Sequence, residues 1–337
     1  MRNIKFFWFL LFCFLVQELD GQDIHFSQFS QSALQLNPAN AGNFNADLRV
    51  AGLHRRQWAS VTVPYKTFSL ATDMKLSMLS EPIRGLGAGI LLNHDEAGDG
   101  SLQTMDIRIL SAYNFPLNED SVHYLRAGIL FGFSQRSIDF NKLSFDNQYN
   151  GDAWDPQAPS GEDFSASRVS WMDLGAGIGW ERRGEKANWN AGLSATHLNR
   201  PDQSFFRTSV HRPVLWQIHA DNQVTLHDQL LLIPSAVFMM QDKFREFNLG
   251  AEIKIGLMNE PTRKYSVGFG IHSRWQDAII PSLAVYVNKF RFGFSYDINT
   301  SGLKTVSNAR GGPEFSVVYL SSKIKARPQR SITCPVY

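Results

Sequence analysis

Large apolar residues recur at every second position of this chain, with small or polar residues between them, over segments of about ten residues. The pattern is clearest in the four segments that begin at Trp189, Phe247, Tyr265 and Phe290. In the last of these, three phenylalanines and a tyrosine alternate with arginine, glycine, serine and aspartate. Because successive side chains of a β-strand point to opposite faces, these segments are predicted to be strands with one apolar and one polar face.

The number of such segments separates a membrane barrel from a soluble sheet, because both architectures alternate in the same way. Ten further segments show the pattern, at residues 47–56, 65–74, 84–93, 103–113, 123–134, 170–181, 213–223, 229–239, 278–287 and 314–322. With the four above they make about fourteen, an even number typical of single-chain outer-membrane barrels. The sequence therefore predicts an all-β protein, a transmembrane antiparallel up-and-down β-barrel. An exported soluble sandwich or propeller is the alternative, but the repeat expected of propeller blades is absent.

The predicted connections alternate between short and long, as the two ends of an outer-membrane barrel require. Short connections lie at residues 182–186, 225–228 and 288–289, on the side that we assign to the periplasm. Long connections lie on the opposite side, at residues 137–168, 198–212 and 299–312. Outward-facing aromatic residues near the strand ends are predicted to form two interfacial girdles, among them Trp180, Trp189, Trp275 and Tyr296.

The two ends of the chain fall outside the alternation. Residues 1–21 have the basic start and short apolar core of a signal peptide, because their apolar run is much shorter than the roughly 20 residues of a spanning helix. Residues 22–46 lack sustained alternation. Irregular backbone is tolerated at membrane depth only inside protein or water, so this segment is predicted to be a plug within a barrel of residues 47–322. Residues 323–337 are then predicted to form a periplasmic tail.

Composition agrees with an exported membrane protein and argues against several other classes. A mean hydropathy of −0.22 is too polar for a bundle of membrane helices. A net charge of +2 without a long basic block argues against nucleic acid as a partner. Of the two cysteines, Cys13 is removed with the predicted signal peptide and Cys334 remains as an unpaired thiol. The mature chain therefore has neither a disulfide framework nor a zinc site built from cysteines.

No pattern of residues indicates catalysis, a cofactor or a resident metal. The nine histidines are dispersed, and no serine or cysteine has a base nearby in sequence to activate it. The acidic stretch at 94–100 lacks the ligand positions of a calcium loop and is predicted to be an exposed loop. Alternating glycines at 85–89 and 175–179 lack the spacing of nucleotide-binding loops and are predicted to leave room inside the lumen. The protein is therefore not expected to be an enzyme.

Charged residues also lie on the predicted inner face of the strands. They carry both signs: Asp106, Arg108, Asp173, Glu252, Lys254, Arg291 and Asp297. Such residues either line a conducting pore or pair across the interior and hold a plug in place. Both interpretations stay open from sequence, although the presence of both signs fits a filled lumen better, because unpaired charge in a dehydrated interior is costly.

Short motifs near both ends of the chain resemble those of the PorP/SprF family of type IX secretion. The first mature residues, 22–29, lead to Asn37, Pro38, Ala39 and Gly42, as in the opening of family members. Next come elements similar to the family's Arg-x-Gln-Trp strand end, its Pro-Tyr pair and an aspartate of its second strand. The candidate site residues in these elements are Arg56, Gln57, Trp58, Pro64, Tyr65 and Asp73. The chain ends on Cys334, Pro335, Val336 and Tyr337, similar to the family's terminal motif.

The resemblance implies an outer-membrane component of type IX secretion or gliding machinery in a Gram-negative bacterium. Such a protein supports export or surface attachment of specific secreted proteins by protein–protein binding. Its implied partners are outer-membrane lipid, a secreted adhesin or other substrate protein, and periplasmic lipoprotein or ring components. Candidates for docking a periplasmic partner lie in the tail: Arg327, Arg330, Cys334, Pro335 and Tyr337. The Asn-Pro-Ala near the amino end also resembles the hatch of FadL-type transporters, so a diffusion channel for hydrophobic small molecules is the alternative function.

Overall fold

The computed structural model describes residues 23–322 apart from 62, 77–84, 118–121, 163–165, 261–263 and 303. Its strands form one closed antiparallel barrel, in which each strand pairs with its neighbours in sequence and β1 pairs with β14. The strands are β1 (Leu48–Gln57), β2 (Tyr65–Lys75), β3 (Leu86–Ala97), β4 (Leu102–Pro116), β5 (His123–Ser137), β6 (Arg168–Arg183), β7 (Ala187–Thr196), β8 (Leu215–His227), β9 (Leu230–Gln241), β10 (Phe244–Asn259), β11 (Lys264–Arg274), β12 (Ala278–Val287), β13 (Phe290–Asn299) and β14 (Arg310–Ser321). Closure leaves no unpaired strand edge in the wall, which satisfies backbone hydrogen bonding where the bilayer offers no water.

The alternation of the sequence divides each strand between the outer surface and the lumen. Phe269 and Ile271 of β11 are exposed on the outer surface, whereas Arg274 on the inner face of the same strand is buried. Ile109 of β4 and Ile129 of β5 are likewise exposed, so the outer surface is apolar around the ring. The predicted barrel is confirmed, and each of the fourteen predicted segments overlaps one strand with its ends shifted by a few residues.

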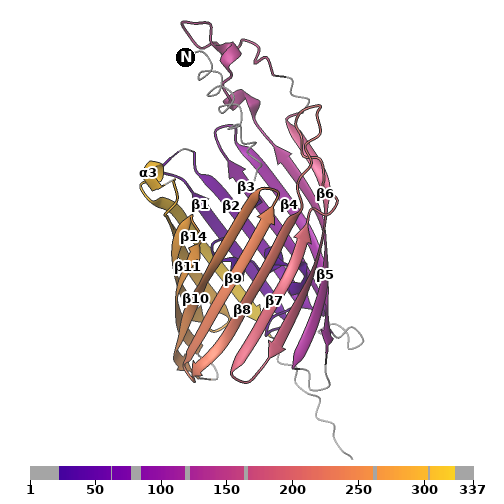
Figure 1. Cartoon of the computed structure of the whole chain (residues 1–337), viewed down its shortest axis with the longest axis vertical. Coiled ribbons are helices and arrows are strands. Elements are labelled where there is room, and N and C mark those ends of the chain that lie inside the picture. The colour runs from indigo at the N-terminus through magenta and orange to yellow at the C-terminus, as the bar shows by residue number, and fades with distance from the viewer. Residues whose placement is uncertain are drawn as a thin grey trace, which may run out of the picture.

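The long connections gather at one end of the barrel (Figure 1). The connection between β5 and β6 extends beyond the strands and carries the short helices η5 (Phe140–Lys142) and η6 (Asp146–Gln148). The connection between β13 and β14 at the same end contains α3 (Lys304–Ser307). Turns at the opposite end are short, as at residues 228–229 and 288–289. Because outer-membrane barrels keep their short turns in the periplasm, we assign this second end to the periplasm and the first to the cell exterior.

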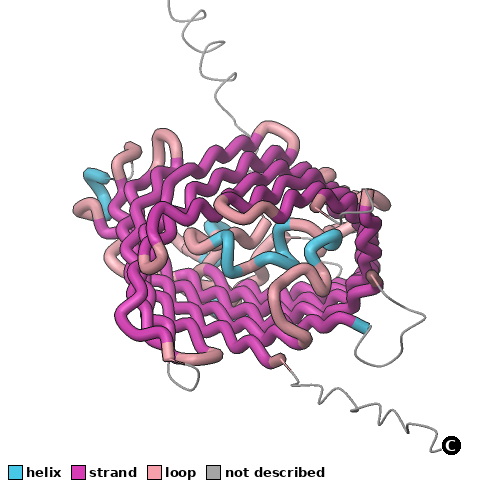
Figure 2. Tube along the Cα trace, turned by 90° about the horizontal axis from the view of Figure 1, so that it is seen from below, coloured by secondary structure: helices cyan, strands magenta, loops and turns pink. Residues whose placement is uncertain are grey.

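Residues 23–47, here called the N-terminal segment, lie inside the ring of strands (Figure 2). The segment contains η1 (Phe29–Gln31), α2 (Ala33–Leu36) and η2 (Pro38–Asn40) before it continues into β1. Two apolar clusters pack it against different parts of the wall. Leu34 joins residues of β1 to β5 and β14, and Leu36 joins residues of β8 and β9. The segment therefore contributes to the packed interior at the position expected of a plug.

Two predicted regions lie outside the described residues: the signal peptide at 1–21 and the tail at 323–337. The second region includes the candidate docking residues Arg327, Arg330, Cys334, Pro335 and Tyr337. Both regions stay predictions from sequence. Among the described residues, no helix has the length and apolar character that crossing a bilayer would require.

Candidate functional site in the barrel lumen

Asn37 fixes the N-terminal segment to the wall and is fully buried there. Its side-chain oxygen accepts a hydrogen bond from the backbone nitrogen of Ala39 at 2.8 Å and thereby caps η2. Its side-chain nitrogen donates to the carbonyl oxygen of Ile178 on β6 at 2.9 Å. Pro38 follows at the first position of the short helix, where the missing backbone N–H would have no helical partner anyway. The Asn-Pro pair thus sets both the local turn and its place in the lumen.

Glycines on the inner face of three strands provide the space for this turn. A Cβ added at Gly128 of β5 would overlap the backbone of Ala39, and one added at Gly177 of β6 would overlap the side chain of Asn37. A Cβ added at Gly87 of β3 would overlap the backbone of Ala41, which follows η2. The glycines at 87 and 177 are among those predicted to leave room inside the lumen. We call these three glycines the glycine seat.

Asp73 joins the end of the N-terminal segment to the first two strands. Its carboxylate accepts a hydrogen bond from the backbone nitrogen of Gly42 at 2.9 Å and two from the guanidinium of Arg49, each at 2.8 Å. Gly42 adopts a φ of +73°, a left-handed conformation that glycine reaches without a steric penalty. The sequence-predicted residues that the structure brings together along the segment are therefore Asn37, Pro38, Ala39, Gly42 and Asp73.

A cluster of buried ion pairs lies nearer the outer end of the lumen and consists of Arg55, Arg274, Asp297 and Glu314. We call this cluster the inner clamp. Asp297 lies 2.7 Å from a guanidinium nitrogen of Arg55 and 3.1 Å from one of Arg274. The inner clamp holds the backbone of the N-terminal segment, because the two carboxylate oxygens of Glu314 accept hydrogen bonds from the N–H groups of Ser27 and Gln28, each at 2.8 Å. Its charges offset one another, and removing one partner of such a buried pair typically costs about 3–5 kcal/mol.

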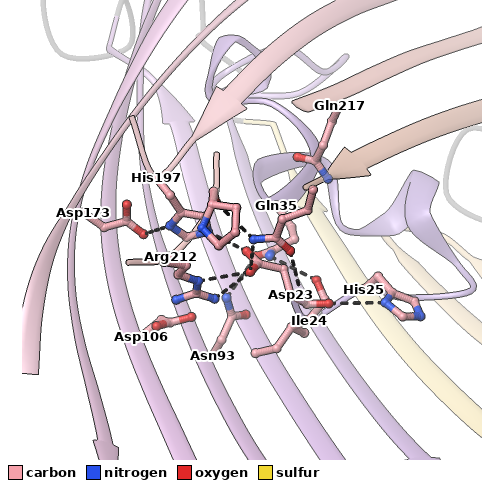
Figure 3. Close-up of polar contacts among 12 residues, drawn as sticks. Asp23, Ile24, His25, Gln35, Asn93, Asp106, Asp173, His197, Arg212 and Gln217 are labelled. Atoms are coloured by element: carbon pink, nitrogen blue, oxygen red, sulfur yellow. Dashed lines mark hydrogen bonds and ion pairs between the residues drawn. The ribbon is translucent and has the colours of Figure 1, made fainter. Parts of the chain in front are cut away.

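Asp23, the first described residue, lies beside Asp173, His197 and Arg212 (Figure 3). With Gln241, these residues form a second cluster, here called the outer cage. The Asp23 carboxylate accepts hydrogen bonds at 2.8 Å from Arg212 Nη2 and from Gln241 Nε2. Burial alone would raise the pKa of Asp23, but the charges of Arg212 and His197 outweigh it and hold that pKa well below its usual range. Asp23 therefore remains a carboxylate in the outer cage at neutral pH.

His197 lies between two carboxylates in the connection that follows β7. Its Nε2 is 2.6 Å from Asp23, and its Nδ1 is 2.6 Å from Asp173 of β6. Burial would lower the pKa of His197, but the negative charge of Asp23 and the contact with Asp173 raise it above its ordinary value. The imidazolium form is therefore favoured, in which Nε2 is hydrogen-bonded to Asp23 and Nδ1 makes a close charge contact with Asp173.

The remaining motif residues lie at the outer rim of the barrel, away from the N-terminal segment. Arg56 is exposed on the outer face of β1, and Gln57 is the last residue of that strand. Trp58 packs edge to face against Tyr65 at the start of β2, with ring centroids 4.9 Å apart, and Pro64 next to Tyr65 is half-buried. These residues close the connection between β1 and β2, and the structure does not bring them to the lumen.

Several residues of the lumen clusters, although some lie within or next to the motifs, were not predicted from the sequence as site residues. Arg55, the neighbour of Arg56, carries the buried guanidinium and is 1% exposed. The alternation along β1 identifies it, because it shares the inner face with buried Leu53. Asp23 and His197 lie outside the strands, where no periodicity distinguishes inner from outer positions.

All the charges predicted on the inner face of the strands except Lys254 lie within ion-pair distance of an opposite charge or of a histidine. Asp106 lies 3.3 Å from Arg108, and Glu252 lies 3.0 Å from Arg291. Lys254 is placed over an aromatic ring at 4.0 Å. Among the residues that the structure describes, no group of three or more His, Cys, Asp or Glu side chains is placed to hold a metal ion. Of the two interpretations left open by the sequence, pairing around a filled lumen fits this geometry.

A closed antiparallel barrel with an apolar outer surface and a charged, paired lumen defines the class of this molecule as an outer-membrane β-barrel. The sequence profile of the type IX secretion system membrane protein PorP/SprF matches residues 18–319. The chain belongs to that family, which confirms the resemblance inferred from the end motifs.

No curated protein matches the chain, whereas solved barrels resemble it remotely. The CymD monoaromatic hydrocarbon channel is 11% identical with a TM-score of 0.46, over 90% of this chain and 96% of that one. A Pseudomonas aeruginosa FadL homologue is 10% identical with a TM-score of 0.46, over 86% and 94% of the two chains. CdiB from Acinetobacter baumannii is 6% identical with a TM-score of 0.42, over 82% and 60%. These similarities are too remote to indicate a function.

Replacing Gly128 with alanine is expected to displace the N-terminal segment, because the new Cβ would overlap the backbone of Pro38 and Ala39. Overpacking of this kind typically costs about 1–3 kcal/mol. Gly52→Ala is the matched control, since a Cβ at Gly52 of β1 has open space around it. In limited proteolysis of the folded barrel, G128A should be cleaved within residues 23–46 faster than the wild type, and G52A at the wild-type rate. Equal rates in all three proteins would contradict the glycine seat.

Raising the pH is expected to loosen the outer cage. Because the pKa of His197 is raised by folding, its charge contributes stability that is fully present below the unfolded value of about 6.5 and is lost as pH rises through the folded value. Hydrogen exchange, corrected for the intrinsic rate at each pH, should show that protection of the Asp23 amide, which donates to Gln241 Oε1 at 3.1 Å, falls as the pH rises above the unfolded value. The variant His197→Gln should remove this dependence. A wild-type protection factor that does not change with pH would refute the charged state of His197.

Proposed function

We propose that this protein is an outer-membrane component of type IX secretion or gliding machinery that supports export or surface attachment of specific secreted proteins by binding them. Its family membership gives the general setting, since the PorP/SprF profile is that of a type IX secretion membrane protein. The structural observation that carries the binding role is the occupied lumen. The N-terminal segment is fixed there by the glycine seat, the inner clamp and the outer cage, and a barrel filled by its own chain is suited to presenting surfaces.

The long outer connections supply a surface for a secreted partner. The connection between β5 and β6 extends furthest from the barrel, and its aromatic side chains Tyr149 and Trp154 are 54% and 41% exposed (Figure 1). Tyr149 and Trp154 are joined by an antiparallel backbone bridge, so both are presented from one ordered turn. Exposed tyrosine and tryptophan are the side chains that most often dominate binding energy in protein interfaces. We therefore place recognition of the secreted protein on this connection.

The periplasmic end is proposed to contact the lipoprotein and ring components of the machine. The tail carries Arg327 and Arg330 together with the family-like Cys334, Pro335 and Tyr337. A basic cluster of this kind complements an acidic protein surface. The tail lies outside the described residues, so this part of the proposal rests on the sequence alone.

The alternative of a diffusion channel for hydrophobic small molecules finds less support. Such a channel needs an apolar path, whereas the lumen holds buried ion pairs at several levels, such as Arg55 with Asp297 and Asp106 with Arg108. The Asn37-Pro38 turn that suggested a hatch is held by hydrogen bonds from Asn37 to one backbone carbonyl of β6 and one of β7. The contents of the lumen therefore favour the binding role over a channel for hydrophobic molecules.

Deleting the gene and complementing it with variants tests the proposed function. Quantitative mass spectrometry of the cell surface and the medium should show that a small set of secreted proteins is lost from the surface in the deletion strain and restored by the wild type. Tyr149→Ala combined with Trp154→Ala should weaken binding of those proteins by roughly tenfold or more. Val306→Ala, on another outer connection and 60% exposed, is the control and should bind normally.

Truncation after Lys323 tests the tail in the same strain. Loss of co-purifying periplasmic components, with the barrel still folded, is the expected result. A surface proteome unchanged by deletion of the gene would contradict the proposed function itself. Uptake of hydrophobic solutes lost in the deletion strain, with secretion intact, would favour the channel instead.

A further inference from the structure

The outer surface of the barrel contains a groove where the first and last strands close the ring. The groove has a volume of about 1020 Å³ and is lined by side chains of β1, β2, β13 and β14 together with the turn between β12 and β13. Its large apolar and aromatic side chains are those of Val50, Leu70, Val287, Phe290, Val317 and Tyr319. Its strand residues belong to the lipid-facing set of positions, because they share the outer face with Leu70 and Val317, whose neighbours along each strand are buried. The groove is therefore a hollow in the surface that the membrane covers.

Gly52 creates the hollow. It pairs with Leu70 on β2 and with Val317 on β14, and both of these neighbours are large and exposed. Nothing lies within 4 Å of the position that a Cβ on Gly52 would occupy. The missing side chain therefore leaves a notch between two rows of lipid-facing residues. Gly52 lies within a strand and faces away from the N-terminal segment, so neither a turn nor close packing of that segment explains the glycine. We infer that another molecule occupies the space beside it.

Aromatic rings form a firm wall along one side of the groove. The rings of Phe290 and Tyr319 lie 4.8 Å apart across the β13–β14 pair. The rings of Phe290 and Phe292 are stacked, with centroids 5.9 Å apart and an interplanar angle of 13°. Packed rings have fewer rotamers to lose than free aliphatic chains, so an acyl chain beside them meets a surface that is already ordered.

The groove is polar at one end only. Asn288 and Lys289 form the periplasmic turn between β12 and β13 and line the groove there. Lys289 is exposed, and among the described residues no carboxylate lies within ion-pair distance of it. By contrast, Lys66 on β2 lies 3.7 Å from Glu96. Lys289 thus offers an unneutralised cation at the level of the lipid headgroups, at the mouth of an apolar channel that runs toward the middle of the bilayer.

We propose that this groove binds one anionic phospholipid of the periplasmic leaflet. Its acyl chain lies in the notch at Gly52 and along Phe290, and its phosphate is bound by Lys289. The distribution of charge and apolar surface along the groove matches that of a phospholipid, which is charged at the interface and apolar in depth. Bound there, the lipid fills the seam between β1 and β14.

Native mass spectrometry of the folded barrel in mild detergent, titrated with dioleoylphosphatidylglycerol, tests the proposal. The wild type should retain one lipid in preference to dioleoylphosphatidylcholine. Gly52→Leu, which fills the notch from open space, and Lys289→Gln, which removes the cation, should each reduce occupancy by about fivefold. The controls are Ala191→Leu, on the outer face of β7, and Lys186→Gln, in another periplasmic turn, and both should bind as the wild type does.

Two further measurements test whether each variant is folded and what occupies the groove. Heat-shifted migration on gels shows that each variant is folded before its lipid content is measured. A photo-crosslinking residue in place of Leu70 then reports what occupies the groove in cells, with a lipid-sized mass increase expected. Equal occupancy in all variants, equal retention of the two lipids, or a cross-linked protein instead of a lipid would overturn the proposal.

Discussion

The pairing of buried charges inside the barrel is the constraint on which the rest of the structure depends. Arg55 and Arg274 of the inner clamp are almost fully buried, and such cations are tolerated only because Asp297 and Glu314 meet them. The Glu314 carboxylate also accepts a hydrogen bond from the N-terminal segment, donated by the backbone N–H of Ser27. Without the segment the carboxylates would face an empty lumen, and without the carboxylates the segment would lack its main polar anchor.

Close packing then makes the segment part of the barrel interior. The glycine seat brings the backbone of η2 against β5 and β6 and the backbone of Ala41, which follows η2, against β3. The outer cage holds Asp23 beneath the outer connections. The chain therefore runs from the outer part of the lumen to the periplasmic start of β1 with anchors along its length. Such an interior gives the outer connections a rigid base, which suits a protein that acts by binding others.

The sequence predicts the barrel well and the site only in part. Strands are predictable because lipid on one side and lumen on the other impose a period of two, as between exposed Phe269 and buried Gly268. The same period marks Arg55 as an inner residue, although the motif resemblance singled out Arg56. His197 and Arg212 were beyond prediction, because their roles depend on how a long connection folds back over Asp23. Loop geometry of that kind follows from tertiary packing, which no local pattern encodes.

A double-mutant cycle between Arg55 and Asp297 tests the central claim most directly. The measurement is the free energy of opening at the Ser27 and Gln28 amides, obtained from hydrogen exchange in wild type, Arg55→Met, Asp297→Asn and the double variant. Each single change removes the closest ion pair of the buried partner, which keeps only its second ion-pair contact, Asp297 with Arg274 or Arg55 with Glu314. The account therefore predicts that the double variant loses less protection than the sum, with a coupling energy of about 1–3 kcal/mol. Strictly additive losses, or full protection in every variant, would show that the inner clamp does not hold the N-terminal segment.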